Sequence, residues 1–345
     1  MTLITIKNLN FNELRQWLTD NGQPAFRAEQ VFNWLYRKWV VDFNAMRNIP
    51  KSLRLLLDEN FTGCSLELVD TQLASDGTEK FLYRLQDGEK IETVLIKARD
   101  RRTVCVSTQV GCPVRCSFCA SGKGGLVRDL QPAEIVDQVV LACRHFEERV
   151  SNIVIMGMGE PLLNYRNLEK ALDLIDAPEG LGIGARRITV STSGIPGGIR
   201  RLANSGRQWN LALSLHATTD IQRARLIPAP YRYPLHEILE ACRYYYSQTN
   251  RMVTLEYTLL HGRNCDSAAA ERLVQIATDL HAKVNLIPYN QTVSRHKAPE
   301  DDEIRKFLEI LARKNVNFTV RHEKGADIQA ACGQLRQSAE NYKKQ

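Results

Sequence analysis

The sequence predicts an α/β fold, in which a parallel sheet with helices between its strands follows a small helical domain at residues 1–85. Two observations support this prediction. From about residue 90, short apolar runs of strand length alternate with segments of helical periodicity, as in chains that form parallel sheets. Before residue 85, apolar residues recur at the three- and four-residue spacing of one helix face. We therefore expect the sheet to hold the functional site and the helical domain to be accessory.

Three short helices are expected in the N-terminal domain. Asn10 is a candidate cap for the first helix, the run Gly22–Pro24 separates the first two, and the third begins near Pro50. Their outward basic residues are candidates for contact with a nucleic acid. The apolar stripes of the three helices are, in order, Phe11, Leu14, Trp17 and Leu18; Ala28, Val31, Phe32, Leu35 and Trp39; and Leu53, Leu56 and Leu57.

Eight strands and the helices between them are expected after residue 90. The helices include Pro132–Phe146, Tyr165–Ile175 and Leu235–Tyr246. The expected strands are Ile91–Lys97, Thr103–Thr108, Asn152–Met156, Arg187–Ser191, Asn210–Ser214, Val253–Leu259, Lys283–Pro288 and Asn317–Arg321. No internal repeat interrupts this pattern.

Polar and small residues gather just after several of these strands. In barrel-like α/β folds the active site lies at the carboxyl ends of the strands, so these residues are candidates for one pocket. Each also has a plainer interpretation: Gly159 and Glu160 as a turn, and Ser191 and Ser214 as helix caps. The candidates are Gly159, Glu160, Ser191, Ser214, Leu215, His216 and Asn290.

Three cysteines lie within eight residues, at Cys112, Cys116 and Cys119. They cannot all pair as disulfides, and they leave a tetrahedral zinc site one ligand short. They suit a [4Fe–4S] cubane in which three irons are held by thiolate and the fourth binds a small chelating ligand. That arrangement is the signature of radical S-adenosylmethionine enzymes. The strand-end candidates are therefore expected to bind the cofactor, as one pocket for the sugar, carboxylate and base of S-adenosylmethionine. The alternatives are a partial zinc knuckle and three buried thiols.

Composition and charge agree with a cytoplasmic enzyme that acts on an anionic partner. The chain has 345 residues, of which 43% are hydrophobic, and no apolar stretch of about 18 residues, so no membrane span is expected. Nine cysteines at irregular spacing do not resemble a secreted disulfide framework. The net charge of +7 falls in clusters such as Lys97–Arg102 and Arg295–Lys297. Together these clusters favour a phosphate backbone, although each alone fits a solvated loop.

Several motifs resemble those of the RlmN/Cfr family of radical S-adenosylmethionine RNA methyltransferases, and its RlmN branch in particular. The resemblance implies a partial (β/α)6 TIM-like barrel over residues 86–335, followed by a tail at 336–345. It also implies one [4Fe–4S] cluster per chain, held by Cys112, Cys116 and Cys119, and two S-adenosylmethionine molecules consumed per methylation. The matching runs, besides the cysteine triad, are Ile91–Val94, Cys105–Cys112, Met156–Pro161, Ser191–Gly194, Ser214–Ala217, Asn285–Asn290 and Ala330–Leu335.

The resemblance also implies roles for three residues. Cys332 would accept a methyl group, which is activated as a radical and joined to the RNA base. Cys105 would then attack the Cys332 sulfur, which releases the product and leaves a disulfide between the two. Glu92 matches the position of a proton acceptor in the family. The sequence leaves open whether Glu92 or Cys105 takes the proton from the adenine ring. The run Glu323–Gly325 and the basic stretch after Asn290 depart from the family pattern.

The expected activity is methylation of carbon 2 of an adenosine in the peptidyl-transferase centre of 23S rRNA. By resemblance to the RlmN branch, the adenosine 3′ to a tRNA anticodon is a second expected substrate. The expected partners are these RNAs and an electron donor such as flavodoxin or ferredoxin, with the enzyme a monomer. The alternatives are Cfr-like methylation at carbon 8 and a non-catalytic RNA-binding protein stabilised by a metal.

Overall fold

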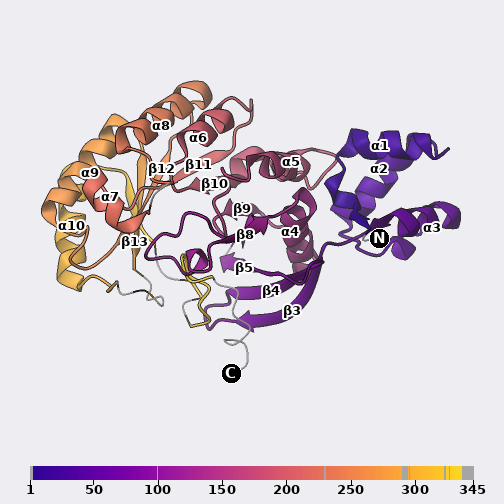
Figure 1. Ribbon diagram of the computed structural model, residues 1–345, viewed down its shortest axis with the longest axis horizontal. Coiled ribbons are helices and arrows are strands. Elements are labelled where there is room, and N and C mark those ends of the chain that lie inside the picture. The colour runs from indigo at the N-terminus through magenta and orange to yellow at the C-terminus, as the bar shows by residue number, and fades with distance from the viewer. Residues whose placement is uncertain are drawn as a thin grey trace.

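A ten-stranded sheet with helices along its outer side forms the centre of the computed structural model (Figure 1). The structure describes residues 3–98, 100–228, 231–289, 294, 296–321, 324–325 and 327–335. The strand order is β14-β13-β12-β11-β10-β9-β6-β5-β4-β3. The pairs from β14 to β6 are parallel, and those from β6 to β3 are antiparallel. The predicted partial barrel with parallel strands is therefore confirmed.

The parallel strands lie within three residues of their predicted ends, and β11 and β13 match them. They are β6 Arg101–Cys105, β9 Asn152–Ile155, β10 Ile188–Thr192, β11 Asn210–Ser214, β12 Thr254–Leu259, β13 Lys283–Pro288 and β14 Phe318–Val320. The helices that cover them are α4 Pro132–Phe146, α5 Tyr165–Asp176, α6 Pro196–Ala203, α7 Asp220–Leu226, α8 Leu235–Thr249, α9 Ser267–Asp279 and α10 Asp301–Arg313, with a short turn η5 Ala185–Arg187.

The N-terminal helices form a separate cluster beyond the α4 and α5 side of the sheet (Figure 1). Asn10 caps the first helix as predicted: its side chain accepts from the Glu13 amide at 2.9 Å, and the Glu13 carboxylate accepts from the Asn10 amide at 2.8 Å. The elements here are β1 Ile4–Thr5, η1 Ile6–Asn8, α1 Phe11–Asp20, α2 Arg27–Phe32, the π-turn η2 Asn33–Arg37, η3 Phe43–Ala45, α3 Lys51–Asn60 and β2 Phe61–Thr62.

The expectation of helices throughout residues 1–85 is wrong for residues 66–85. They form strands β3 Leu66–Leu73 and β4 Glu79–Leu85, which pair with each other and extend the sheet through β5 Lys90–Ala98. The turn between β3 and β4 contains Asp76 and Gly77, and Gly77 has a φ of +80°. An Asp-Gly pair of this kind is a strong hairpin signal, and here it was overlooked. The helical part therefore ends near residue 62.

A buried ion pair joins the helical part to the barrel. The Lys7 ammonium lies 2.7 Å from the Asp137 carboxylate on α4, and both side chains are fully buried. The amide and hydroxyl of Ser65 each donate to the same carboxylate at 2.7 Å. The first turn of α4 is tied to the helical part as well, because the Ala133 amide donates to the Asn8 side chain.

Among the described residues, no helix has the length and apolar character needed to cross a bilayer.

Candidate active site

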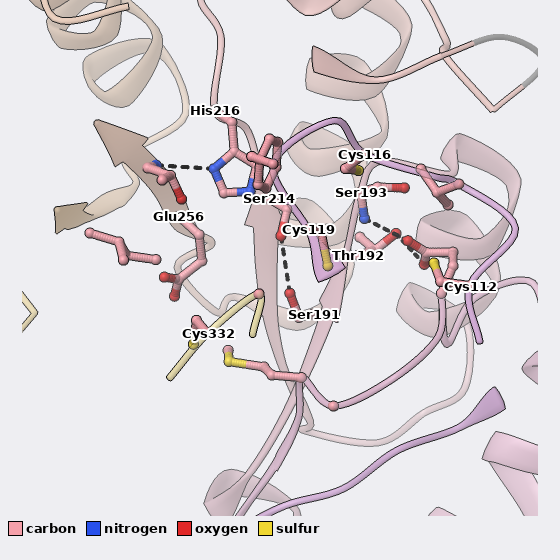
Figure 2. Close-up of a pocket in the computed structure, with 18 of the residues that line it drawn as sticks. Cys112, Cys116, Cys119, Ser191, Thr192, Ser193, Ser214, His216, Glu256 and Cys332 are labelled. Atoms are coloured by element: carbon pink, nitrogen blue, oxygen red, sulfur yellow. Dashed lines mark hydrogen bonds between the residues drawn. The ribbon is translucent and has the colours of Figure 1, made fainter. Parts of the chain in front are cut away.

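A cavity of about 150 Å³ opens at the carboxyl ends of the parallel strands. Figure 2 shows side chains of the cysteine loop, of the strand ends and of the segment that carries Cys332 around one space. The structure brings together most of the predicted site residues: the cavity is lined by Cys112, Cys116, Cys119, Gly159, Glu160, Ser191, Ser214, His216 and Cys332.

The cysteine loop lies between two short antiparallel strands, β7 Gln109–Gly111 and β8 Leu126–Asp129, and includes the turn η4 Ala120–Gly122. Gly111 closes this hairpin at a φ of +78°, and a Cβ there would lie 1.9 Å from the Gly125 carbonyl oxygen, so only glycine fits. The Ser117 amide donates to the Leu226 carbonyl at 2.9 Å, which fastens the loop to α7. The loop is thus held against the strand ends.

The three thiols of this loop match in number the thiolate ligands of a [4Fe–4S] cubane with one open iron. All three are free cysteines at the cavity wall. Among the residues that the structure describes, no three His, Cys, Asp or Glu side chains converge as ligands of one metal ion. A cubane does not require such convergence, because each of its three irons takes one thiolate. Burial raises the pKa of the Cys112 thiol to about 12, so this thiol is protonated when no metal is bound.

The Glu160 carboxylate is hydrogen-bonded to residues at the end of β10. It accepts from the Thr192 hydroxyl at 2.8 Å and from the Ser193 amide at 2.7 Å, and burial raises its pKa. Next to it, Gly159 has a φ of +110°, and a Cβ there would lie 2.7 Å from the Gln109 Cβ. Glu160 therefore shapes the cavity wall, and Gly159 lets the backbone pass close to the loop before the cysteines.

The ends of β10 and β11 supply hydroxyl and imidazole groups. The Ser191 and Ser214 hydroxyls lie 3.4 Å apart. His216 Nδ1 accepts from the Thr258 amide at 3.0 Å, so a neutral ring carries its proton on Nε2. Burial, with the Arg223 charge as a second cause, lowers the His216 pKa to about 3 and keeps the ring neutral. Phe118 of the cysteine loop packs edge-on against this ring, with centroids 4.8 Å apart.

Two predicted cofactor-binding residues are not placed in the cavity. The Leu215 side chain is fully buried in the core, its amide donates to the Glu256 carbonyl at 3.0 Å, and its carbonyl accepts from Arg223. It positions the strand end rather than lining the cavity. Asn290 lies outside the described residues, as does the predicted tail at 336–345.

Cys105 and Cys332 face a second, smaller cavity of about 50 Å³, which we call the thiol cavity, and Cys332 lines both cavities. The segment that carries Cys332 is fastened to the cysteine loop, because the Ala120 amide donates to the Gly333 carbonyl at 2.7 Å and the Ser121 hydroxyl donates to the Leu335 carbonyl at 2.7 Å. Burial raises the Cys105 pKa to about 12, with the Cys332 charge as a second cause. Two thiols from opposite ends of the barrel are thus brought to one space beside the larger cavity.

Glu92 lines neither cavity. It is buried on β5, where its carboxylate lies 3.3 Å from the Lys80 ammonium. Val94 and Ile96, two and four residues further along the same strand face, do line the cavity of Cys105 and Cys332. Glu92 therefore continues that face away from the two thiols.

Glu256 and Arg321 also line the larger cavity, and sequence reasoning missed both. Arg321 was the last residue of an expected strand, so the strand-end rule that selected Ser191 and Ser214 points to it as well. Glu256 lies within β12, and no motif surrounds it. Its place in the cavity wall becomes visible only in the three-dimensional structure, where the neighbouring strands lie side by side.

Comparisons with known proteins agree with this geometry. Residues 106–272 match the radical SAM superfamily, and residues 4–62 match the N-terminal domain of ribosomal RNA large subunit methyltransferases. The class is thus a radical SAM enzyme with an N-terminal domain found in RNA methyltransferases.

Relatives narrow the class to one family. A probable dual-specificity RNA methyltransferase RlmN from Staphylococcus saprophyticus is 47% identical over 96% of this chain and 92% of its own. One from Halalkalibacterium halodurans is 46% identical over 97% of this chain and 93% of its own. A crystal structure of a radical SAM methyltransferase from Sphaerobacter thermophilus superposes with a TM-score of 0.94 and 45% identity, covering 97% of this chain and 100% of that one. The chain belongs to the RlmN family of radical SAM RNA methyltransferases.

Membership in this family implies an iron–sulfur cluster and S-adenosylmethionine as the cofactors. The three thiols of the cysteine loop and the neighbouring strand-end cavity suit those two groups. The alternative of a non-catalytic RNA-binding protein loses its support, because the family consists of enzymes.

Proposed function

We propose that this enzyme methylates carbon 2 of an adenosine in 23S rRNA, and of the adenosine 3′ to a tRNA anticodon, through a methyl group carried on Cys332. The observation that supports it best is the shared cavity of Cys105 and Cys332 beside the cysteine loop. A methyltransferase that passes the methyl group directly from cofactor to base would need neither thiol. The relatives' names, which describe dual-specificity RNA methyltransferases, support two RNA substrates.

The cofactors supply a methyl group and, after reductive cleavage of a second S-adenosylmethionine, a radical that removes hydrogen from a methyl group. Cys112, Cys116 and Cys119 would hold the cluster. The Ser191 and Ser214 hydroxyls and the His216 Nε2–H would bind the polar groups of S-adenosylmethionine, and Gly159 would let the backbone approach it. Glu160 would keep the β10 end in place through Thr192 and Ser193.

Cys332 and Cys105 would act in sequence. Cys332 accepts the methyl group on its sulfur and, after hydrogen removal, holds the carbon that bonds to the adenine ring. Once joined to the ring, the adduct would lose one electron, which the cluster would take back, and the ring proton. Cys105, entering as thiolate, is our candidate for the base that takes this proton, since it shares the thiol cavity and Glu92 does not line it. The Cys105 sulfur then bonds to the Cys332 sulfur, and the sulfur–carbon bond breaks with its electron pair going to the carbon, which takes the thiol proton and becomes the methyl group. This frees the methylated RNA and leaves a disulfide for cellular reductants.

The substrate and partners follow from charge and family. The net charge of +7 suits an RNA partner, and the N-terminal helices carry exposed cationic groups such as Lys38, whose ammonium lies 3.6 Å from the Trp34 ring centroid. We propose flavodoxin or ferredoxin as the electron donor, a monomeric enzyme and a cytoplasmic location.

The test is a trapped intermediate. Cys105→Ala, incubated with RNA, S-adenosylmethionine and reductant, should accumulate a protein–RNA adduct that resists denaturation and disappears with nuclease. Cys105→Ala combined with Cys332→Ala should give no adduct. Cys143→Ala is a matched control, because Cys143 is a buried thiol in the core and touches neither cavity. Turnover of Cys105→Ala at the rate of the parent enzyme would refute the proposal.

The methylated position needs a second measurement. Mass spectrometry of adenosines from treated 23S rRNA and tRNA should find 2-methyladenosine in both. 8-Methyladenosine would instead favour Cfr-like chemistry, and product in rRNA alone would remove the tRNA substrate.

A further inference from the structure

The segment that carries Cys332 is attached to the barrel on two sides. We call residues 324–335 the Cys332 segment, of which the structure describes all but residue 326. Its last residues are hydrogen-bonded to the cysteine loop. Its first residues lie at the turn between β3 and β4, and Figure 1 shows the segment in yellow beside the ends of these strands. The proposed function gives this second attachment no role.

The turn between β3 and β4 makes two hydrogen bonds to the Cys332 segment. The Ser75 amide donates to the Asp327 carboxylate at 2.9 Å, and the Gly325 amide donates to Asp76 Oδ2 at 3.3 Å. The Lys324 ammonium also lies 3.4 Å from Asp76 Oδ2. Asp76 therefore binds the segment through one carboxylate oxygen, which accepts from a backbone amide and faces a cation.

The other carboxylate oxygen of Asp76 belongs to the turn itself. Asp76 Oδ1 accepts from the Thr78 amide at 2.9 Å, and the Ala74 amide closes the turn by donating to the Thr78 carbonyl at 2.8 Å. Thr78 is buried against the segment, because a Cβ at Gly325 would lie 2.9 Å from Thr78 Cγ2. Gly325 also has a φ of +64°, which favours glycine. The turn and the segment therefore pack with no side chain between them at this point.

A row of residues leads from this turn to Cys105. Lys80 on β4, Val94 on β5 and Cys105 on β6 are register partners, and directly opposed residues of antiparallel strands lie on one face of the sheet. Val94 and Cys105 line the thiol cavity together with Cys332. The Lys80 ammonium lies 3.5 Å from the Gln329 carbonyl oxygen. The Cys332 segment thus crosses this face of the sheet, from the turn at its start to Cys105 near its end.

We propose that Asp76 is a positioning residue that, together with the hydrogen bond between Ser75 and Asp327, holds Cys332 beside Cys105 for disulfide formation. The proposed function requires these two sulfurs to bond, and this role of Asp76 rests on it. Each attachment restricts the path of the segment, so less conformational entropy is lost when the sulfurs meet. Attachment on both sides therefore raises the effective concentration of one thiol at the other.

The test measures how readily the two thiols pair in the whole chain. The parent carries Cys112→Ser, Cys116→Ser and Cys119→Ser, so that the thiols of the cysteine loop do not compete. In anaerobic glutathione buffers, two protein thiols and one glutathione disulfide give one protein disulfide and two glutathiones, which take up the two thiol protons. Peptide mass spectrometry gives the fraction of chains in which Cys105 is linked to Cys332, and this fraction gives the effective concentration.

Asp76→Asn separates the two tasks of Asp76. The Asn side chain keeps one oxygen for the Thr78 amide, whereas its NH₂ group can neither accept from the Gly325 amide nor pair with Lys324. The effective concentration should fall about twofold to tenfold, the range expected for one lost hydrogen bond. Asp327→Ala, which removes the acceptor of the Ser75 amide, should lower it by a similar factor.

The matched control is Asp70→Asn, which makes the same change of charge on β3. The Asp70 carboxylate accepts from the Thr71 amide beside it at 2.7 Å. This control should keep the effective concentration of the parent. If Asp76 only stabilised the turn, Asp76→Asn would lower the unfolding temperature and leave the thiol equilibrium of the folded protein unchanged.

The outcomes separate the role of Asp76 from the function on which it rests. If folded Asp76→Asn keeps the effective concentration of the parent, the inference is wrong while the function stands. If Cys105→Ala forms no adduct with RNA, the function fails, and the glutathione equilibrium still decides whether Asp76 places Cys332. If Asp76→Asn does not fold, an unchanged effective concentration in Asp327→Ala overturns the inference.

Discussion

Replacing Lys7 by Met should destabilise the attachment of the N-terminal helices to the barrel. Lys7 and Asp137 are both fully buried and 2.7 Å apart, so the substitution leaves a carboxylate in the core without its cation, although the Ser65 amide and hydroxyl still donate to it. Breaking a buried pair from one side costs about 3–5 kcal/mol. Total stabilities are about 5–15 kcal/mol, so the loss is a large share. Adding Asp137→Asn should recover about 1–3 kcal/mol, because the charge is gone and the amide oxygen still accepts from Ser65.

Urea unfolding of cluster-free protein measures this loss. Three of the four tryptophans, Trp17, Trp34 and Trp39, lie in the helical part, so fluorescence reports on that part and circular dichroism on the whole chain. The control is Lys170→Met: its pair with Glu13 also joins the two parts, but both side chains are about 40% exposed, so at most about 1 kcal/mol is expected. Equal effects of Lys7→Met and Lys170→Met, or no recovery with Asp137→Asn, would contradict the reasoning.

Three further predictions concern the site. Ala at Cys112, Cys116 or Cys119 should each abolish stable iron binding after anaerobic reconstitution, measured as iron and sulfide per chain, and a variant with full iron and normal cofactor cleavage would exclude that ligand. Gly159→Ala should weaken S-adenosylmethionine binding in calorimetry and cost about 1–3 kcal/mol of stability, because φ is +110° and the new Cβ meets Gln109, whereas Gly197→Ala, with open space around its Cβ, should be neutral or better. Because burial raises the Cys105 pKa to about 12, iodoacetamide at pH 9 should label Cys105 far more slowly in folded than in urea-unfolded protein, and equal rates would show that the thiol is exposed.

Sequence reasoning located the barrel and the cysteine loop because both depend on short-range patterns. An apolar run such as Asn210–Ser214 is a strand wherever it lies in the sheet, and three thiols within eight residues must share a loop. The hairpin of β3 and β4 was missed for the converse reason. β3 is an edge strand with mostly exposed residues, so it lacks the apolar run that identified the others.

Other features of the site could not be predicted from the sequence, because they depend on contacts between segments that are distant in the chain. Whether Glu160 offers its carboxylate to a ligand depends on Thr192 and Ser193, which are more than thirty residues away in sequence. Glu256, Arg321 and Cys332 line the same cavity, which depends on strand register and on the path of the C-terminal segment. Resemblance supplied the thiol pair and Glu92, but it does not reveal that Glu92 bonds Lys80 and lines neither cavity.

The two hydrogen bonds between the Cys332 segment and the cysteine loop have a consequence for how the enzyme matures. Ala120 and Ser121 follow Cys119 directly, so the loop that would hold the proposed cluster also holds Gly333 and Leu335. Under the proposed function, a chain that has not yet received its iron and sulfide would have a looser loop and, with it, a looser C-terminal segment. Cluster insertion would then come first in assembly and methyl loading of Cys332 second, so that immature chains would not consume S-adenosylmethionine.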